Sequence, residues 1–421
     1  MKRNVRVASA PGFTKRLLRD TLLPLSLRRT KCFREVEPMV PPLDGLRVIS
    51  MAEQYPGPYC TLLLADMGAD VILVERPRVG DPSRGPGGMS DFFAALNRNK
   101  RSVAVDLKTA AGREICRRLS AGVDVFIEGF RPGTVDRLGL GYSALRELNP
   151  RLVYCSLSGF GQNGPYRLRP AHDISFQGIA GLLANLIDKG SFADRPGVAI
   201  GDLSSGMFAA LGILAALWAR ERTGRGQYVD VSMADGLVSW MTTALTSVIN
   251  GGRPLDLSAG AGYGVYKTAD GKYLTLSIAL EPHFWRNLWQ TVGRPDLAEI
   301  SFLDRLKRNQ ELQAVIEEIL LTKTRDEWVE MLAAADVPSA PVLSLEEVAR
   351  DPQVQARGMI VEWEAPDGRK IGMVNHPIQF SDTPASIRRA APELGEHTEE
   401  VLREAGYGSE DMARLREAGA V

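Results

Sequence analysis

The sequence of 421 residues has few cysteines and histidines, and it has no excess of charge of either sign. Lys plus Arg and Asp plus Glu both number 51, so no overall field attracts nucleic acid or an anionic membrane. Its four cysteines, Cys32, Cys60, Cys116 and Cys155, show no Cys-x-x-Cys or Cys/His metal spacing. The sequence therefore predicts neither a metal site nor a disulfide framework, which fits a reducing cytoplasm.

Two other signals are also missing. The longest uncharged apolar stretch, Met207 to Ala219, is too short to cross a bilayer, so we expect a buried helix and no membrane span. No Gly-x-Gly-x-x-Gly follows the first predicted strand, where Glu53 to Pro58 reads EQYPGP. A nicotinamide or flavin dinucleotide is therefore not implied. The hydrophobic fraction of 44% and the charged fraction of 24% are those of a globular protein.

The first 38 residues form a basic extension. Ten Lys or Arg residues lie between Lys2 and Arg34, against the single acid Asp20. The stretch lacks the continuous apolar run of a secretory signal, although an organelle transit peptide has a similar composition. Alternatively the extension is disordered, or it reflects an upstream start codon, with Met39 as the natural first residue. We expect a cytoplasmic protein, with organelle targeting left open.

From Leu46 onward, short apolar runs alternate with longer amphipathic ones, which predicts an α/β fold with a parallel, Rossmann-like sheet. A long helix over about 204–221 precedes a strand over 228–232 and a helical stretch to about 249. Residues 250–262, rich in Gly, Ser and Pro, predict a linker. The expected strands are Leu46 to Met51, Val71 to Glu75, Ser102 to Val105, Asp124 to Ile127 and Leu152 to Leu157, and the helices between them are Thr61 to Met67, Ala110 to Leu119 and Tyr142 to Leu148.

A smaller α+β domain is predicted over residues 263–335. It begins with a hairpin in which Asp270-Gly271 separates two alternating runs, and it continues with helices to about Ala335. Residues 336–421 are expected to return to the large domain, whose first part covers residues 39–249. The large domain is thus expected to be built from both ends of the chain.

Asp202 is the first candidate for chemistry. It stands in Gly-Asp-Leu-Ser-Ser-Gly206, directly before the long apolar helix. An Asp in this position is often a helix N-cap. The same geometry could keep a carboxylate ionised beside the positive end of the helix dipole, ready to act as a nucleophile or a base.

Three further residues are candidates for acid or base roles. His172 and Asp173 adjoin each other at a loop-to-helix junction, in a chain with only four histidines. Glu281 precedes Pro282 at the end of a predicted strand. The structural alternatives are a helix cap for Asp173 and Glu281, and a solvated loop residue for His172.

Basic and polar residues gather near the ends of the predicted strands, where a parallel sheet collects its ligand. Arginine forks and lysine point charges there would suit nucleotide phosphates, whereas the structural alternative is a set of solubilising surface residues. The candidates for ligand binding are Arg76, Arg84, Asn97, Lys100, Arg101, Arg131, Arg137 and Arg169.

Taken in order, several segments resemble the class III CoA-transferase family of the CaiB/BaiF type, which also contains the α-methylacyl-CoA racemases. The resemblance spans Pro42 to Val421. Its motifs are PLDGLRVISMAEQYPGPYCTLLLADMGADVILVERP, GDPSRG, NRNKRSVAVDL, GFRPGTVDRLGLGY, NPRLVYCSLSGFGQNGPY, GDLSSG, TGRGQYVDVSM and LGEHTEEVL. No single motif is decisive, but their order along the whole chain is.

The resemblance implies a Rossmann-like large domain joined by linkers to the small domain, with two chains threaded through each other as an interlocked homodimer. It implies that Asp202 is the active-site aspartate and that an acyl-CoA thioester is the substrate. Coenzyme A would then be part of the substrate, and no cofactor would be bound permanently.

The family supports two reactions. In a transferase, the aspartate attacks the thioester and becomes an aspartyl-CoA thioester, from which a second carboxylic acid takes the CoA. In a racemase, two groups exchange the α-proton of a 2-methylacyl-CoA. His172-Asp173 and the segment beginning at Glu281 resemble the racemases, whereas GDLSSGM resembles the transferases. The expectation leans to the racemase, with Glu281 on one face and His172 paired with Asp202 on the other. CoA transfer is the alternative, and a non-catalytic acyl-CoA-binding subunit is a remote one.

Overall fold

Six parallel strands form the main sheet, in the order β3-β2-β1-β4-β5-β6. This is the strand order of the doubly wound dinucleotide-binding folds, so the predicted α/β class and parallel sheet are confirmed. The computed structural model describes residues 40–188, 197–254, 259–365 and 367–421, and the basic extension lies outside them. The strands are β1 (Arg47–Met51), β2 (Asp70–Glu75), β3 (Lys100–Ala104), β4 (Val125–Glu128), β5 (Val153–Ser158) and β6 (Tyr228–Ser232).

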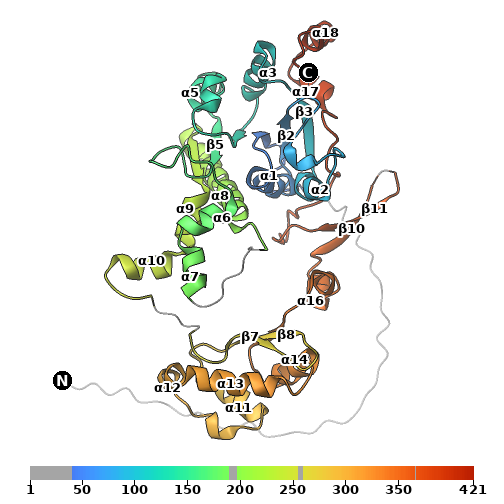
Figure 1. Cartoon of the computed structure of the whole chain (residues 1–421). Coiled ribbons are helices and arrows are strands. Elements are labelled where there is room, and N and C mark those ends of the chain that lie inside the picture. Colours follow the sequence, from blue (N-terminus) through green and yellow to red (C-terminus); the bar gives the residue numbers. More distant parts are fainter. Residues whose placement is uncertain (1–39, 189–196, 255–258, 366) are drawn as a thin grey trace, which may run out of the picture. The chain divides into compact units, whose positions relative to one another are not determined.

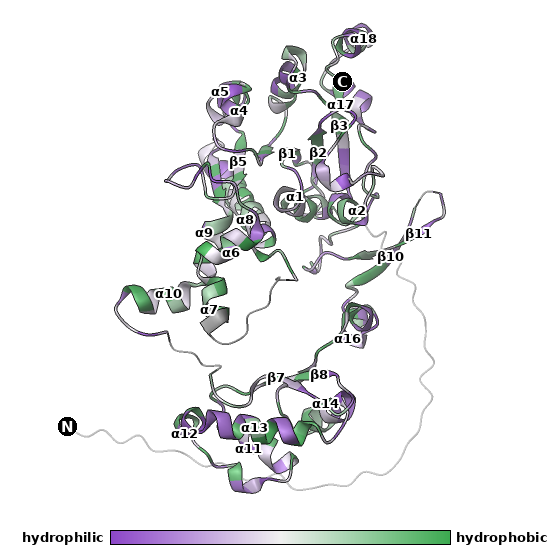
Figure 2. Ribbon diagram, viewed as in Figure 1, coloured by the Kyte–Doolittle hydropathy of each residue, from purple (hydrophilic) through white to green (hydrophobic). Residues whose placement is uncertain are grey.

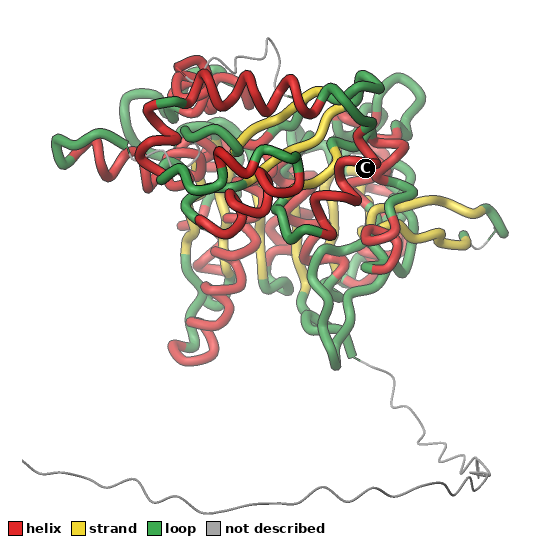
Figure 3. The backbone as a smooth tube through the Cα atoms, turned by 90° about the horizontal axis from the view of Figure 1, so that it is seen from below, coloured by secondary structure: helices red, strands yellow, loops and turns green. Residues whose placement is uncertain are grey.

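Helices cover both faces of this sheet (Figure 1). Neighbouring strand residues point to opposite faces, so Val48 belongs to one apolar core and Ile49 to the other. One core includes α1 (Pro56–Asp66) and α8 (Ile200–Thr223). The other includes α3 (Ala110–Ser120), α5 (Tyr142–Leu148), α17 (Thr398–Glu404) and α18 (Ser409–Glu417). Figure 3 shows the strands in yellow between red helices.

Helix α8 begins earlier than predicted, at Ile200 instead of Ser204. Among the described residues it is the one helix whose length and composition would allow it to cross a membrane. Ala209, Ile213 and Ala216 are nevertheless buried against the sheet and α1, as expected of a core helix. The predicted strands and helices of the first half agree with the structure, except that α1 starts at Pro56, where proline suits the first turn.

Several further helices complete the first half of the chain. Those before α8 are η1 (Pro82–Arg84), α2 (Asp91–Asn97), α4 (Thr134–Arg137), α6 (Asp173–Ile179) and α7 (Leu182–Asp188). After β6 come α9 (Met233–Trp240) and α10 (Thr242–Ile249). The predicted linker over 250–262 falls partly outside the described residues.

A second, three-stranded sheet has the order β7-β8-β9. Its strands β7 (Tyr263–Lys267) and β8 (Tyr273–Ser277) flank Gly271, whose φ of 76° fits the predicted turn. Strand β9 (Ser339–Pro341) pairs with β8, so this sheet extends beyond the predicted boundary at residue 335. Its helices are α11 (Pro282–Thr291), η2 (Pro295–Leu297), α12 (Phe302–Lys307), α13 (Asn309–Leu320) and α14 (Arg325–Ala334).

The C-terminal part of the chain closes the β3 edge of the main sheet. After α15 (Leu345–Val348) and α16 (Pro352–Ala356) comes a hairpin that was not predicted, formed by β10 (Ile360–Glu364) and β11 (Lys370–Val374). His397 N then donates to Ser102 O, and Asp106 N donates to Ala420 O. Val401 and Leu402 are fully buried in the sheet core. An exposed strand edge is thereby covered.

Candidate active site

A cavity of about 640 Å³ lies at the carboxyl ends of β1, β4 and β5. Its walls include Glu53, Gln54 and Tyr55 after β1, the turn 129–132 after β4, and Ser158 to Phe160 at the end of β5. Strands β1 and β4 are neighbours at the point where the strand order reverses. Open α/β sheets bind their ligands at this switch point, so the fold itself marks this cavity as a ligand site.

Asp202 lines this cavity, half-buried, from the first turn of α8. The N-cap of α8 is Ala199, so the structural alternative of an N-cap role for Asp202 is wrong. Among the described residues, none donates a hydrogen bond to its carboxylate. Burial and the nearby Asp173 carboxylate raise the pKa of Asp202 to about 6, while His172 acts to lower it. With a pKa of about 6 the group is mostly ionised at neutral pH, and no hydrogen bond from the described residues occupies its carboxylate, which suits a nucleophile.

Asp173 explains how the start of α8 is held. Its Oδ1 accepts hydrogen bonds from the backbone N–H of Gly201 at 2.6 Å and of Asp202 at 3.3 Å. The side chain therefore caps α8 across space, although it belongs to the first turn of α6. His172, the N-cap of α6, lines the cavity beside it. The structure thus brings Asp202, His172 and Asp173 together.

Of the predicted ligand-binding residues, Arg131 and Arg169 line the cavity, and both are exposed. The Arg169 guanidinium stacks on the Tyr166 ring at 3.6 Å from its centroid. Arg167, which the sequence reading did not include, lines the same cavity. These three exposed arginines give the solvent-facing part of the cavity wall a positive charge.

Four other predicted ligand-binding residues are buried in internal contacts, and none of them lines the cavity. The Nε and Nη2 atoms of Arg84 donate to the two carboxylate oxygens of Glu75, each at 2.7 Å. Lys100 donates to Asn97 Oδ1 and to the backbone of α1. Arg101 pairs with three carboxylates, those of Asp70, Glu400 and Glu404. Because their hydrogen-bonding groups are used inside the protein, we assign Arg84, Asn97, Lys100 and Arg101 structural roles.

Three predicted residues lie elsewhere. Arg76 is exposed and pairs with Glu53, a cavity residue, at 3.4 Å. Arg137 bonds to Thr134 within α4. Glu281 belongs to the unit of the three-stranded sheet, where it is the N-cap of α11 and its Oε2 accepts from Ala279 N. Neither Arg137 nor Glu281 is among the described residues that line the cavity.

The sequence reading missed the cavity wall formed by Glu53, Gln54 and Tyr55. Gln54 adopts a left-handed conformation, with φ of 68°, and its N–H donates to Asp81 Oδ2. Only the position of this segment, directly after the first strand of a parallel sheet, could have indicated a ligand-binding loop.

Comparisons with known proteins identify the family of this chain. A family model described as CoA-transferase family III matches residues 43–398. The chain belongs to CoA-transferase family III. A succinate–glutarate CoA-transferase of Agrobacterium fabrum is 37% identical over 86% of this chain and 96% of its own. A formyl-CoA:oxalate CoA-transferase of Rhodopseudomonas palustris strain TIE-1 is 35% identical over 91% and 98%.

The fold agrees with this membership in CoA-transferase family III. The crystal structure of a CaiB/BaiF family protein from Brucella suis is 34% identical and covers 87% of this chain and 100% of that chain, with a TM-score of 0.74. The chain is therefore an enzyme of CoA-transferase family III, and the two relatives from Agrobacterium and Rhodopseudomonas are named as CoA-transferases. These names favour the transferase alternative over the racemase that the sequence led us to expect.

Proposed function

We propose that the protein is a CoA-transferase in which Asp202 carries coenzyme A from an acyl-CoA donor to an acceptor carboxylic acid. The observation that carries this proposal is the unbonded Asp202 carboxylate in the switch-point cavity. The names of the family III relatives support the same reaction. Their acids, including succinate, glutarate and oxalate, are the first acceptors to test.

The first half of the reaction forms the enzyme-bound thioester. An Asp202 oxygen attacks the thioester carbonyl of the donor, the C–S bond breaks, and CoA leaves as a thiolate. This step gives a mixed anhydride. The thiolate then attacks the Asp202 carbonyl carbon, which releases the donor's acid and leaves an aspartyl-CoA thioester.

The second half repeats these steps with the acceptor. The acceptor carboxylate attacks the aspartyl thioester and expels CoA thiolate, which gives a second mixed anhydride. Attack of the thiolate on the acceptor's carbonyl then forms the new acyl-CoA and regenerates the Asp202 carboxylate. No proton is transferred in the net reaction, so two acid/base groups on opposite faces are not required.

The surrounding residues have complementary roles in this proposal. Asp173 holds the first turn of α8, which fixes the backbone of Asp202. His172 favours the ionised form of Asp202. The exposed Arg131 and Arg169 at the mouth are suited to the phosphates of CoA, because guanidinium groups pair well with phosphate oxygens.

The experiment that tests the reaction is mass spectrometry of the protein after incubation with succinyl-CoA and no acceptor. We expect a CoA adduct on Asp202 that disappears when glutarate or oxalate is added. Asp202→Asn should form no adduct and should lose activity by about 10³-fold or more, as expected for loss of a nucleophile. Deuterium incorporation at the α-carbon of a 2-methylacyl-CoA, without an adduct, would instead favour racemisation.

We also propose that two copies of the chain associate, as the family resemblance implies. Hydrophobic residues recur along the ribbons of α8, α9 and α10 (Figure 2), and several of them are exposed in the single chain. They include Leu211, Trp218, Trp240, Val248 and Ile249, the last 71% exposed. Large apolar side chains exposed on three successive helices that contact one another support an association site. Light scattering should give twice the chain mass of 46.0 kDa, and a monomer at micromolar concentration would exclude the dimer.

A further inference from the structure

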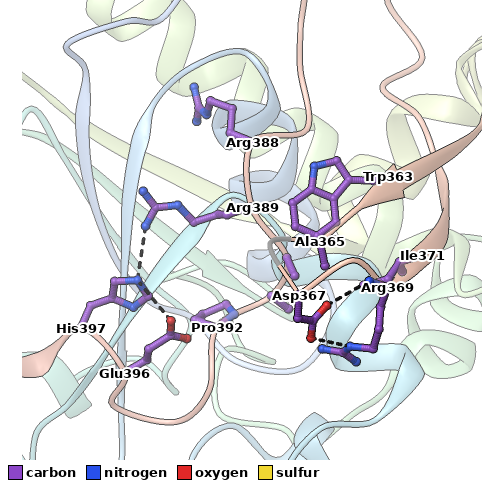
Figure 4. Close-up of a pocket in the computed structure, with 12 residues that line it drawn as sticks. Trp363, Ala365, Asp367, Arg369, Ile371, Arg388, Arg389, Pro392, Glu396 and His397 are labelled. Atoms are coloured by element: carbon purple, nitrogen blue, oxygen red, sulfur yellow. Dashed lines mark hydrogen bonds and ion pairs between the residues drawn. The ribbon is translucent and has the colours of Figure 1, made fainter.

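A second cavity, of about 290 Å³, lies between the β10–β11 hairpin and the segment 388–397 (Figure 4). It shares no lining residue with the Asp202 cavity. Its walls combine the Trp363 ring and small apolar residues with the side chains of Arg369, Arg389 and His397. The site is therefore separate from the proposed chemistry.

The backbone that carries Arg389 is fixed. Asn99 Oδ1 accepts from the N–H of Arg388 and of Arg389, and Asn99 N donates to Arg389 O. Asn99 is itself buried and bonds to Asp66. The exposed Arg389 side chain thus projects from a rigid support.

His397 is fixed as well, from the edge of the main sheet. It is 9% exposed, and its backbone N–H donates to Ser102 O. Ser102 N donates in turn to the Nδ1 of the ring, at 3.3 Å. A backbone N–H can only donate, so Nδ1 is the acceptor and the hydrogen of the neutral ring is on Nε2. Burial lowers the pKa of His397, and this keeps the ring neutral near pH 7.

These contacts leave two donors that face each other. The Nε2 atom of His397 lies 3.3 Å from Nη1 of Arg389 (Figure 4). Both atoms carry hydrogens and neither has a lone pair to offer, so they cannot bond to each other. The nearest carboxylate oxygen, Glu396 Oε1, is 3.8 Å from Nε2, which is too far for a hydrogen bond. An acceptor oxygen between the two donors would satisfy both.

The charges around this point favour an anion. Arg388 also lines the cavity, and its Nη2 donates to the backbone carbonyl of Ala65 in α1. A hydrogen bond to a carbonyl does not neutralise the guanidinium, so its positive charge still favours an anion. Arg369, on the hairpin, is paired with Asp367 at 2.7 Å. Glu396 opposes an anion, but its side chain is half exposed and is therefore screened by water. Among the described residues that line the cavity, the two arginines Arg388 and Arg389 outweigh Glu396, since the other lining acid, Asp367, is paired with Arg369.

We propose that this cavity binds a phosphoryl oxyanion, one oxygen of which accepts hydrogen bonds from both Arg389 and the Nε2–H of His397. The anion is either free phosphate or the phosphate of a nucleotide whose planar ring lies beside Trp363. Both share the same chemistry at the two donors, and they differ only in the contact with the ring.

Calorimetric titration of the full chain with inorganic phosphate tests the site. We expect saturable binding that Arg389→Gln weakens by about tenfold or more, the usual cost of losing a charged hydrogen bond. Arg369→Gln is the matched control, because it removes the same charge from the same cavity but from a residue already paired with Asp367. It should keep the affinity of the wild type within about threefold.

The result that overturns the proposal is equal phosphate affinity in wild type and Arg389→Gln, or no saturable binding of either phosphate or AMP. Binding that is lost in Arg131→Gln would overturn it too, because the phosphate would then occupy the Asp202 cavity. Tighter binding of AMP, weakened by Trp363→Ala, would identify the nucleotide as the source. In ¹⁵N spectra, phosphate should shift the Nε2–H signal of His397, and thermal melting without phosphate checks that each variant is folded.

Discussion

At the scale of single residues, the proposed reaction depends on the ionisation of Asp202. Its pKa is raised to about 6, and only the ionised form is a nucleophile. We therefore expect kcat/KM to be about half its plateau value near pH 6, to fall about tenfold per pH unit well below that, and to level off above about pH 7. The fall at low pH is the acidic limb of the pH–rate profile, and it is measured with an acyl-CoA donor and an acceptor acid that are chemically stable over this range. A profile that stays level down to pH 4.5 would contradict the assignment.

Two neighbours should move this limb in opposite directions. Asp173 raises the pKa of Asp202, so Asp173→Asn, which keeps an oxygen for the Gly201 N–H, should shift the limb to lower pH. His172 lowers that pKa, so His172→Ala should shift the limb to higher pH. Each shift should be up to roughly one pH unit. Two shifts of the same sign would show that the effect is structural.

The grouping of Asp202, His172 and Asp173 was predicted from the sequence, because each of these ionisable residues stands at the start of an apolar helical segment. It could not separate ligand-facing arginines from internal ones. Arg84 and Arg131 look alike in sequence, but Arg84 is buried against Glu75 and Arg131 lines the cavity. That difference depends on which strand end each residue follows and on a partner distant in sequence, neither of which local patterns contain.

At the scale of elements, the site depends on how closely α8 approaches α1. A Cβ atom at Gly206 would lie 2.7 Å from Pro56 O and 3.3 Å from Cys60 N, both backbone atoms. Gly206→Ala should therefore push the helices apart, cost about 1–3 kcal/mol of unfolding free energy and lower activity, since two cavity residues, Asp202 in α8 and Tyr55 at the N-cap of α1, would move with them.

Gly212→Ala on the same helix is the control for this prediction. Its Cβ would meet only the end of a side chain, Val229 Cγ1, at 2.9 Å. Both changes gain about 1 kcal/mol of helix propensity, so their difference isolates the packing of α8 on α1. Chemical denaturation and kcat/KM of both variants give the answer, and equal effects would exclude the packing explanation.

Glu128, at the end of β4, links pH to stability. Burial raises its pKa to about 7, although hydrogen bonds from Ser156 and from Phe130 N act to lower it. Between pH 4.5 and about 7, Glu128 keeps its proton in the folded protein but has lost it in the unfolded chain. The contribution of Glu128 to the free energy of unfolding therefore declines as the pH rises through this range. Denaturation at pH 5 and pH 8 should show that Glu128→Gln gains stability relative to wild type at the higher pH. Parallel pH profiles would refute this.

Elements with strong periodicity were predictable, and those fixed by distant contacts were not. The main strands and α3 follow regular apolar patterns. Every strand residue of the hairpin β10–β11 is at least partly exposed, so no buried apolar pattern marks it in the sequence. Arg98 Nη1 donates a hydrogen bond to Val374 O, which connects the hairpin to the segment just before β3 of the large sheet. The start of α8 was misplaced because the side chain that accepts from its first N–H groups belongs to Asp173, 28 residues away in sequence from Gly201, and not to its N-cap residue Ala199.

At the scale of the whole molecule, the main sheet needs both ends of the chain. Val401, Leu402 and Met412 fill one face of its core from the last two helices. A chain that ends at Glu396 should therefore expose that face, bind hydrophobic dyes and unfold without cooperativity. Met412→Ala, which removes a single side chain, should instead cost about 2–5 kcal/mol and leave a cooperative transition. Near-ultraviolet circular dichroism during thermal melting distinguishes the non-cooperative unfolding of the truncated chain from the cooperative unfolding of Met412→Ala.

The covered β3 edge has a further consequence for how the protein is made. Ala420 accepts a hydrogen bond from Asp106 N beside that edge, and His397 N donates to Ser102 O in β3. Synthesis proceeds from the N-terminus, so residues 397–420 leave the ribosome after every strand of the main sheet has emerged. Until these residues dock, the nascent chain carries an unsealed border, and during that interval the open strand can pair with other chains.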